Sequence, residues 1–196
     1  MMQPVKRDEV LPLGDYEAIR DRFRNRVIAD KKERRLALGE DMSVIFENHD
    51  TVLLQIQEML RTERITREAA VQHEIDTYNE LVPGADQLSM TLFIEISDRD
   101  RREQTLARCA GMESHVFLEV DGERFAAKAQ HREGADASRT TAVQYYLIDL
   151  SAEVAQRMRD GKASEVALVV DHPAYQARAV VGASTRRQLE GDLAWS

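Results

Sequence analysis

Apolar residues at helical spacing mark the first part of the chain. Asp15 is a suitable cap for a helix that begins near Tyr16, and Gly39 is a suitable stop. Three apolar residues recur every fourth position in between and predict one buried stripe: Ile19, Phe23 and Val27. The next positions of the stripe carry charge instead: Asp30, Lys31 and Arg34. We therefore expect the second half of this helix to leave the core or to meet a partner.

A short strand and a helical hairpin are predicted next. MSVIFE (42–47) alternates between two sets of residues, as a strand does. Two stripes at helical spacing follow, over about 51–64 and 67–82, and Thr66 is the expected cap of the second helix. Because only a few residues join these helices, residues 50–82 should form an antiparallel hairpin.

The second half of the chain changes to the period-two alternation of β-strands. LSMTLFIEIS (88–97) carries the clearest pattern. Asp121-Gly122, between HVFLEV and ERFAAKA, predicts a tight hairpin because glycine readily takes positive φ. The remaining predicted elements are the strands TAVQYYLIDL, EVALVV and YQARAVV, helices over 98–111 and 151–161, a last helix from Thr185, and a surface loop over 132–139.

These elements predict an α+β protein, in which an N-terminal helix and a helical hairpin pack with a largely antiparallel sheet of six to seven strands. A length of 196 residues suits one domain with a substantial core. We therefore expect a single domain over 1–196, helix-rich over 1–84 and strand-rich over 88–196. Because aromatic residues make up only 6% of the chain, aliphatic side chains must fill most of that core.

The chain is acidic overall, but one segment is basic. A net charge of −8 argues against nucleic acid as a general partner, since phosphate binding needs a concentrated basic surface. Residues 20–35 hold eight Lys or Arg against three Asp or Glu, a local charge of +5, so the remainder carries −13. Such charge runs are most often simply solvated. The functional alternative is a partner-binding surface made by four cations: Arg24, Arg26, Lys31 and Lys32.

Several classes of protein lack support in the sequence. No apolar run approaches the ~20 residues of a membrane helix, and no secretory signal is evident, so we expect a cytoplasmic location. Cys109 is the only cysteine, which excludes an internal disulfide and a cysteine-only metal cage. Phosphate-binding loops, nucleophile elbows and two-histidine zinc motifs are absent, and whether the protein is an enzyme stays open.

Two clusters that combine histidine with acidic residues raise the question of a metal site. In a straight hairpin His49 and His73 lie about nine residues apart along the axis, roughly 14 Å, which is too far for two ligands of one ion. Glu58 and His73 lie at equal height, with Glu74 beside them, and these three are the candidate metal ligands. Since Glu58 and His73 point away from the apolar stripes, this site needs a further ligand from another strand or subunit. No other cofactor is expected.

The junction Asn48-His49-Asp50 has a simpler explanation as a helix start. Asn48 or Asp50 can cap the helix, and the charge of Asp50 is favourable at its N-terminus. The alternative is an anion or substrate contact at the same end of the helix.

The order and spacing of four segments resemble an uncharacterised family of bacterial proteins, known only as a domain of unknown function. These segments are FENHDTVLLQIQEMLR, HEIDTYNELVPG, RTTAVQYYLIDL and VVDHPAY. The resemblance covers nearly the whole chain and assigns no catalytic residue. It implies a context, because such genes often neighbour those for rubrerythrin-like proteins and iron–sulfur oxidoreductases.

Three functions follow as hypotheses. The first is a non-catalytic accessory or interaction protein in a redox or oxidative-stress setting, self-associating and partnered by a rubrerythrin-like or iron–sulfur protein. The alternative is a metal-dependent enzyme or metal-binding protein that uses Glu58, His73 and Glu74. A weaker alternative is nucleic-acid binding through residues 20–35.

Overall fold

The computed structural model describes residues 2–130 and 138–194, and this part of the chain contains eight strands and six α-helices. The strands are β1 (Arg35–Leu38), β2 (Met42–Glu47), β3 (Gln87–Ile94), β4 (Val116–Val120), β5 (Glu123–Ala129), β6 (Val143–Asp149), β7 (Val166–His172) and β8 (Tyr175–Val180). The helices are α1 (Leu13–Glu33), α2 (His49–Thr62), α3 (Glu68–Asn79), α4 (Arg99–Arg108), α5 (Ala152–Arg159) and α6 (Ala183–Ala194), with single 3₁₀ turns η1 (Arg7–Glu9) and η2 (Met112–Ser114). The predicted α+β class is confirmed. Within the described ranges, no helix has both the length and the apolar character needed to cross a bilayer.

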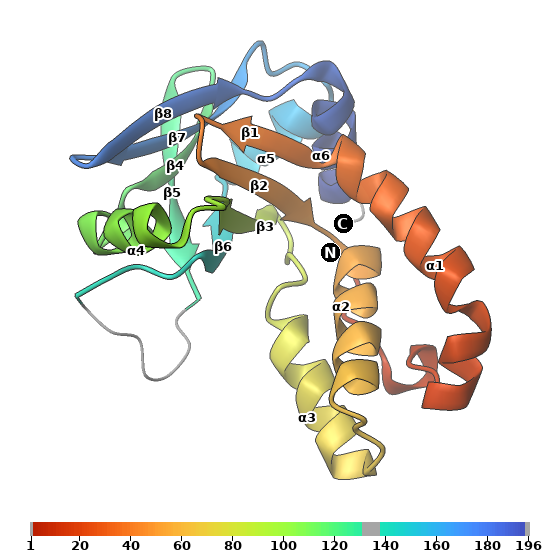
Figure 1. The fold of residues 1–196 in the computed structure, drawn as a ribbon. Helices are drawn as coiled ribbons and strands as arrows, with labels where there is room; N and C mark the ends of the chain where they lie inside the picture. The colour runs from red at the N-terminus through yellow and green to blue at the C-terminus, as the bar shows by residue number, and fades with distance from the viewer. Residues whose placement is uncertain (1, 131–137, 195–196) are drawn as a thin grey trace.

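The strands form one sheet in the order β1-β2-β3-β6-β5-β4-β7-β8, and every neighbouring pair is antiparallel. The sheet curls until its two edge strands approach each other, as Figure 1 shows for β1 and β8. The hydroxyl of Tyr175 in β8 donates a hydrogen bond of 2.7 Å to the carbonyl of Leu38 in β1. The sheet is therefore a nearly closed barrel.

Aliphatic side chains fill the barrel, as the period-two patterns predict. The predicted inner faces of β2 and β3 are both in its core, with Met42, Val44 and Phe46 from β2 and Leu88, Met90, Leu92 and Ile94 from β3. The hairpin predicted at Asp121-Gly122 joins β4 to β5, and both residues have positive φ, +51° and +88°. The period-two pattern thus predicted the inner faces of β2 and β3 correctly.

Strand β1 corrects the sequence analysis at residues 35–38. We expected the first helix to run to Gly39, but α1 ends at Glu33 and Arg35–Leu38 pair with β2. Gly39 has a φ of +77° and lies between β1 and β2 instead of ending a helix. A strand of four residues is too short to produce a recognisable period, so the sequence pattern does not separate it from the preceding helix.

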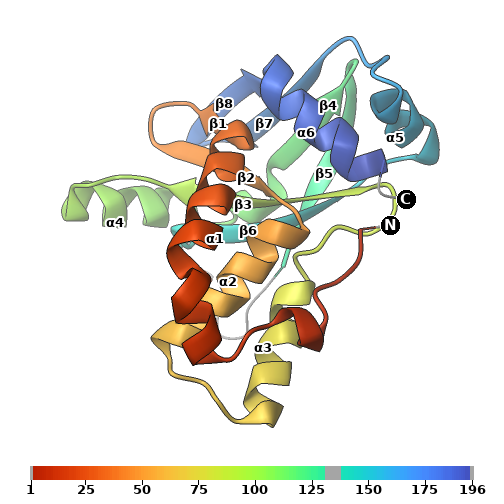
Figure 2. The same cartoon turned by 90° about the vertical axis from the view of Figure 1, so that its right-hand side faces the viewer.

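Helices α1, α2 and α3 form a layer beside the barrel, with α2 in the middle (Figures 1 and 2). α2 and α3 form the predicted hairpin, and their apolar stripes meet in a second core made by Val52, Ile56, Leu60, Val71, Ile75 and Tyr78. Residues 2–11, which we call the N-terminal arm, run alongside α3 and then toward the start of α1 (Figure 2). The arm adds Val5 and Val10 to this second core.

The details of α1 differ from the prediction. It begins at Leu13 after Pro12, so Asp15 does not cap it. Tyr16 and Val27 are buried, whereas Ile19 is 44% exposed, because a step of four residues turns a stripe by about 40° and carries Ile19 off the packed side.

Two other predicted boundaries have different outcomes. Thr66 is not the cap of α3, which follows Arg67 without a side-chain cap. Residues 132–137 of the predicted loop lie outside the described residues.

Candidate functional site

Arg34, the residue that directly follows α1, is a buried cation at the junction of α1, β1 and α6. Its side chain is only 4% exposed, and that of its partner Asp192 in α6 is 7% exposed. The guanidinium binds both carboxylate oxygens of Asp192, and it also donates to Asp30 at 2.7 Å and to Gln188 at 3.2 Å. Burial raises the pKa of Asp192, and the hydrogen bond from Arg34 partly offsets this effect. The pair is therefore a fixed polar wall inside the molecule.

The N-terminus of α2 supplies a second wall. Asn48 is the cap: its side chain accepts from the amide of Thr51 at 2.9 Å, and the Thr51 hydroxyl accepts from the amide of Asn48 at 2.9 Å. The cap prediction is thus confirmed for Asn48 and wrong for Asp50. Asp50 lies in the first turn and forms an ion pair of 2.9 Å with Arg26.

His49 lies between two carboxylates at this end of α2. Its Nδ1 is 3.4 Å from Asp50, and its Nε2 is 3.2 Å from Glu9 of the N-terminal arm. The hydrogen bond with Asp50 and the nearby charge of Glu9 raise the pKa of His49 above its ordinary value, against a smaller opposing effect of burial. The same contact with His49 lowers the pKa of Asp50. His49 thus links the N-terminal arm to the start of α2.

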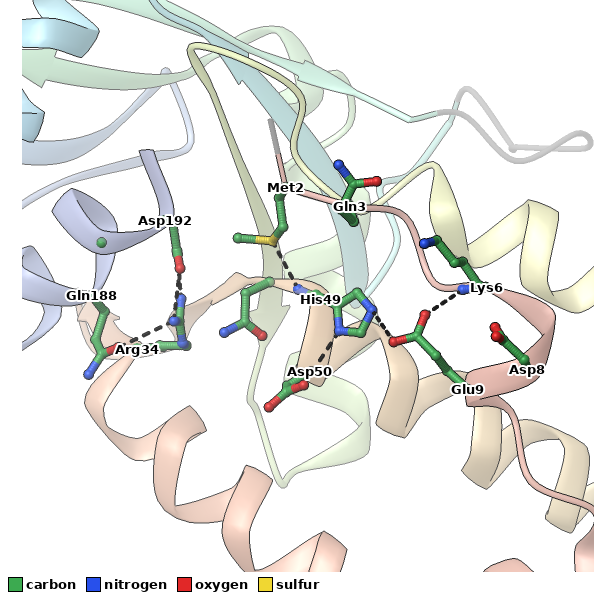
Figure 3. Close-up of a pocket in the computed structure, with 12 residues that line it drawn as sticks. Met2, Gln3, Lys6, Asp8, Glu9, Arg34, His49, Asp50, Gln188 and Asp192 are labelled. Carbon is green, nitrogen blue, oxygen red and sulfur yellow. Dashed lines mark hydrogen bonds and ion pairs between the residues drawn. The ribbon is translucent and has the colours of Figure 1, made fainter. Parts of the chain in front are cut away.

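The arm, the end of α1, the start of α2 and the end of α6 line an open cavity of about 690 Å³ (Figure 3). Figure 3 shows Arg34 with Asp192 and Gln188 at one end, His49 and Asp50 in the middle, and Lys6, Asp8 and Glu9 toward the other end. The cavity is lined by Met2, Gln3, Lys6, Asp8, Glu9, Arg34, Asn48, His49, Asp50, Gln188, Gly191 and Asp192. It brings together segments from both ends of the described chain.

The lining is strongly polar, with a small excess of negative charge. Four carboxylates face two permanent cations and one histidine, so the net charge of the lining is −1 when His49 is protonated and −2 when it is neutral. Three of the carboxylates already have cationic partners, because Glu9 contacts His49, Asp50 contacts Arg26 and Asp192 contacts Arg34. Such a lining can hold a polar molecule by hydrogen bonds and charge.

Glu58, a predicted metal ligand, is covered by α1. Both of its carboxylate oxygens accept hydrogen bonds from Arg20 at 2.8 Å, and one also accepts from the hydroxyl of Tyr16 at 2.7 Å. The bonds from Arg20, more than that from Tyr16, lower the pKa of Glu58. The element next to Glu58 is therefore a helix that supplies a cation instead of a further metal ligand.

The other two predicted ligands lie on the outer helix of the hairpin. His73 is exposed and Glu74 is half-buried. Over residues 2–130 and 138–194, no group of three or more His, Cys, Asp or Glu side chains is placed so that it could hold a metal ion. The structure thus does not bring Glu58, His73 and Glu74 together as a ligand set, and the metal site stays a prediction that needs ligands from a second subunit.

The basic segment divides into two equal groups. Arg20, Arg26, Arg34 and Arg35 form ion pairs with Glu58, Asp50, Asp192 and Glu95, respectively. Arg22, Arg24, Lys31 and Lys32 form none with a described carboxylate. Arg26 therefore differs from the other predicted partner-binding cations: about 160° of helix rotation separates it from Arg24, and it serves the junction with α2.

Sequence reasoning missed the cavity because its walls come together only in the fold. Arg34 gave one signal, a charge at a position where the apolar stripe should continue. Asp192 and Gln188 gave none, since they lie about 150 positions from Arg34 in the sequence. His49 and Asp50, at the helix end where an anion or substrate contact is the alternative prediction, lie in the cavity wall.

Comparisons with known proteins place the chain in a family. A crystal structure described as a novel protein of unknown function from Burkholderia pseudomallei K96243 is similar, with 35% sequence identity and a TM-score of 0.89 over 97% of this chain and 100% of that chain. No curated protein matches the sequence. The model of a family described as a protein of unknown function (DUF3501) matches residues 4–193. The chain therefore belongs to the DUF3501 family.

Proposed function

We propose that the protein is a non-catalytic accessory protein that binds a small polar molecule in the cavity between the N-terminal arm, α2 and α6. The supporting observation is the cavity itself, about 690 Å³ of space bounded by charged groups from four separate segments. Two of these groups, Arg34 and Asp192, have side chains that are more than nine-tenths buried. The cavity volume is in the range of ligand pockets, about 300–1,000 Å³. Burial makes the charges of Arg34 and Asp192 costly, and their place in the cavity wall favours a role in recognition.

The expected ligand carries a positive charge, alone or as part of a zwitterion. The lining has a net charge of −1 to −2, which disfavours polyanions such as nucleotides. Asp8 supports this assignment because, unlike Glu9, Asp50 and Asp192, it has no cationic partner among the described residues. An amine near Asp8 and Glu9 would balance the excess negative charge of the lining.

The same contacts support binding over catalysis. A general base must be free to take a proton at working pH. Both ring nitrogens of His49 face carboxylates, so neither is free to take a proton from a substrate. Arg34 and Asp192 satisfy each other and do not present an unpaired acid or base to a substrate.

Filling the cavity tests the proposal. Gly191 lines the cavity within α6, and a side chain added there meets open space. Gly191→Leu should therefore fold and should also gain helix propensity. Gly14 of α1 is the matched control, because it also lies in a helix, has open space around its Cβ position, and is outside the cavity lining.

The readout is a thermal-shift screen of small amines and zwitterions, confirmed by calorimetric titration. We expect at least one compound to stabilise the unaltered protein and Gly14→Leu but not Gly191→Leu. Equal stabilisation of the two variants would move the binding site elsewhere. No stabilising compound for the unaltered protein would contradict the proposal.

A second candidate function is protein binding through α1. The observation in its favour is that Arg24, Lys31 and Lys32 have no carboxylate partner among the described residues, although many other arginines have one. An acidic protein surface would fit them, and a rubrerythrin-like or iron–sulfur redox protein, or a second copy of this chain, is the proposed partner.

The test compares two triple variants of equal charge change. Arg24, Lys31 and Lys32 changed to Ser should weaken binding to a candidate partner, measured by titration at low and high salt. Sedimentation of each triple variant without a partner shows whether the same three cations also support self-association. Arg67, Arg99 and Arg187 changed to Ser form the control, because they also lack a described carboxylate partner but lie off α1. Equal weakening by both sets would mean that only net charge matters.

A further inference from the structure

The N-terminal arm is bound to the helical hairpin through its backbone, on both sides of the 3₁₀ turn η1. Asn79 at the end of α3 accepts from the amide of Val5 at 2.8 Å and donates to the carbonyl of the same residue at 2.9 Å. Gln57 of α2 does the same for Leu11, accepting at 2.7 Å and donating at 3.2 Å. Two side-chain amides thus hold the backbone of the arm at two points, and the arm joins no strand of the sheet.

Side chains of the arm add anchors between these two points. Val5 and Val10 are buried in the hairpin core at 2% and 3% exposure. Arg7 forms a double hydrogen bond with Glu68 of α3, at 2.7 and 2.9 Å, and Glu9 contacts His49. Met2 is also buried, and its sulfur accepts from the amide of His49 at 3.0 Å. Each of these contacts is local and reversible, and a thioether is a weak acceptor.

The arm borders unfilled space along much of its length. Five of the residues that line the large cavity belong to it. A smaller cavity of about 230 Å³ lies under its other end, beside Arg7, Val10, Leu11 and the start of α1. A segment held by side chains over two cavities is less firmly packed than one that is paired in a sheet or packed as a helix.

We infer that the N-terminal arm is a gate: it detaches from α2 and α3 as a unit, turning near Pro12, and so widens the access of the ligand to the cavity that it lines. This inference rests on the proposed function, since a gate needs a ligand to admit. When closed, the arm supplies Lys6, Asp8 and Glu9 to the ligand, so binding and closure favour each other. The alternative is a fixed strap that separates only when the whole protein unfolds.

Thiol labelling distinguishes a gate from a strap, without any ligand. In Val5→Cys the introduced thiol is buried while the arm is closed, and the native Cys109, 1% exposed in the barrel core, reports global unfolding in the same molecule. With an aromatic disulfide reagent under native conditions, we expect the introduced thiol to react at least about tenfold faster than Cys109. Equal rates for the two thiols would overturn the inference.

The amide contacts are tested by adding Asn79→Ala to Val5→Cys. Loss of both hydrogen bonds to the backbone of residue 5 should raise the labelling rate of the introduced thiol by about tenfold and leave that of Cys109 unchanged. Gln72→Ala is the control, because Gln72 lies on the same helix and bonds only to Asp76 in the described chain. An unchanged rate for the introduced thiol in the Asn79 variant would also contradict the gate.

Hydrogen exchange in the unaltered protein covers the case in which Val5→Cys disturbs the fold. The amides of Val5 and Leu11 should exchange faster than those in the middle of α2, and any compound from the cavity screen should slow them. Exchange of these amides only at the rate of global unfolding would refute the gate even if a ligand binds. Fast exchange with no ligand found would count against the proposed function and leave the movement of the arm established.

Discussion

The barrel and the helical layer are closed in different ways. The barrel brings its edge strands together after seven antiparallel pairings, and one side chain, Tyr175, bonds across the remaining seam. The helical layer is completed by the N-terminal arm, which Asn79 and Gln57 hold by side-chain amides. Both cavities described above border the arm, and the barrel core is filled by aliphatic side chains. The two cavities thus lie where side chains, and not backbone pairing, complete the structure.

Arg34 connects the two regions, and its removal should produce the largest effect. Arg34→Met leaves Asp192 buried without its cationic partner, so we expect a loss of about 3–5 kcal/mol in the free energy of unfolding. The measurement is denaturant unfolding followed by circular dichroism. Replacing both residues, as Arg34→Met with Asp192→Leu, should recover most of the loss because no charge is left unpaired.

Arg20→Met provides the comparison inside the helical layer. Arg20 and Glu58 are 23% and 29% exposed, so water can solvate Glu58 once its partner is gone, and Tyr16 still donates to it. The loss should be clearly smaller than for Arg34→Met. Similar losses would show that Arg34 and Asp192 do not hold the two regions together in the way described.

The seam of the barrel should respond next. An added Cβ at Gly39 would overlap the Tyr175 hydroxyl, and the positive φ there already disfavours other residues. Gly39→Ala should therefore cost about 2–3 kcal/mol of unfolding free energy. Gly111→Ala, with a similar φ of +80° and open space around its Cβ position, should cost only about 1 kcal/mol. Equal costs would mean that the Tyr175 contact adds nothing to closure of the barrel.

The same contrast explains which features the sequence could reveal. Period-two patterns predict the barrel strands, and 3.6-residue patterns predict α2 and α3, because burial of one face imposes each pattern. The sequence does not reveal strand β1 or the cavity, and the reasons differ. Arg35–Leu38 are too few to show a period, and Arg34 meets Asp192 only in the fold, because all eight strands lie between them in the sequence. Glu58 illustrates a further limit, because its partner, Arg20, depends on how α1 packs against α2.

The pH dependence of the arm is the smallest expected effect and tests the side-chain closure directly. The pKa of His49 is raised in the folded protein, so its contribution to stability is complete below about pH 6.5 and is lost as pH rises through the folded value. The charged groups around it are Glu9 on the arm, Asp50 on α2, and Arg26 on α1, which contacts Asp50. The unfolding free energy of the unaltered protein should exceed that of His49→Gln by under about 1 kcal/mol at pH 6, and the difference should shrink toward pH 9.

Glu9→Gln tells whether this pH dependence acts through the arm. Because it removes the carboxylate on the arm and leaves Asp50 in place, the effect of His49→Gln on the unfolding free energy at pH 6 should become smaller in the Glu9→Gln background. An effect that is constant from pH 6 to 9, or unchanged by Glu9→Gln, would show that His49 stabilises α2 alone. The arm would then be held by Asn79, Gln57 and its valines, and closure of the helical layer would not respond to pH.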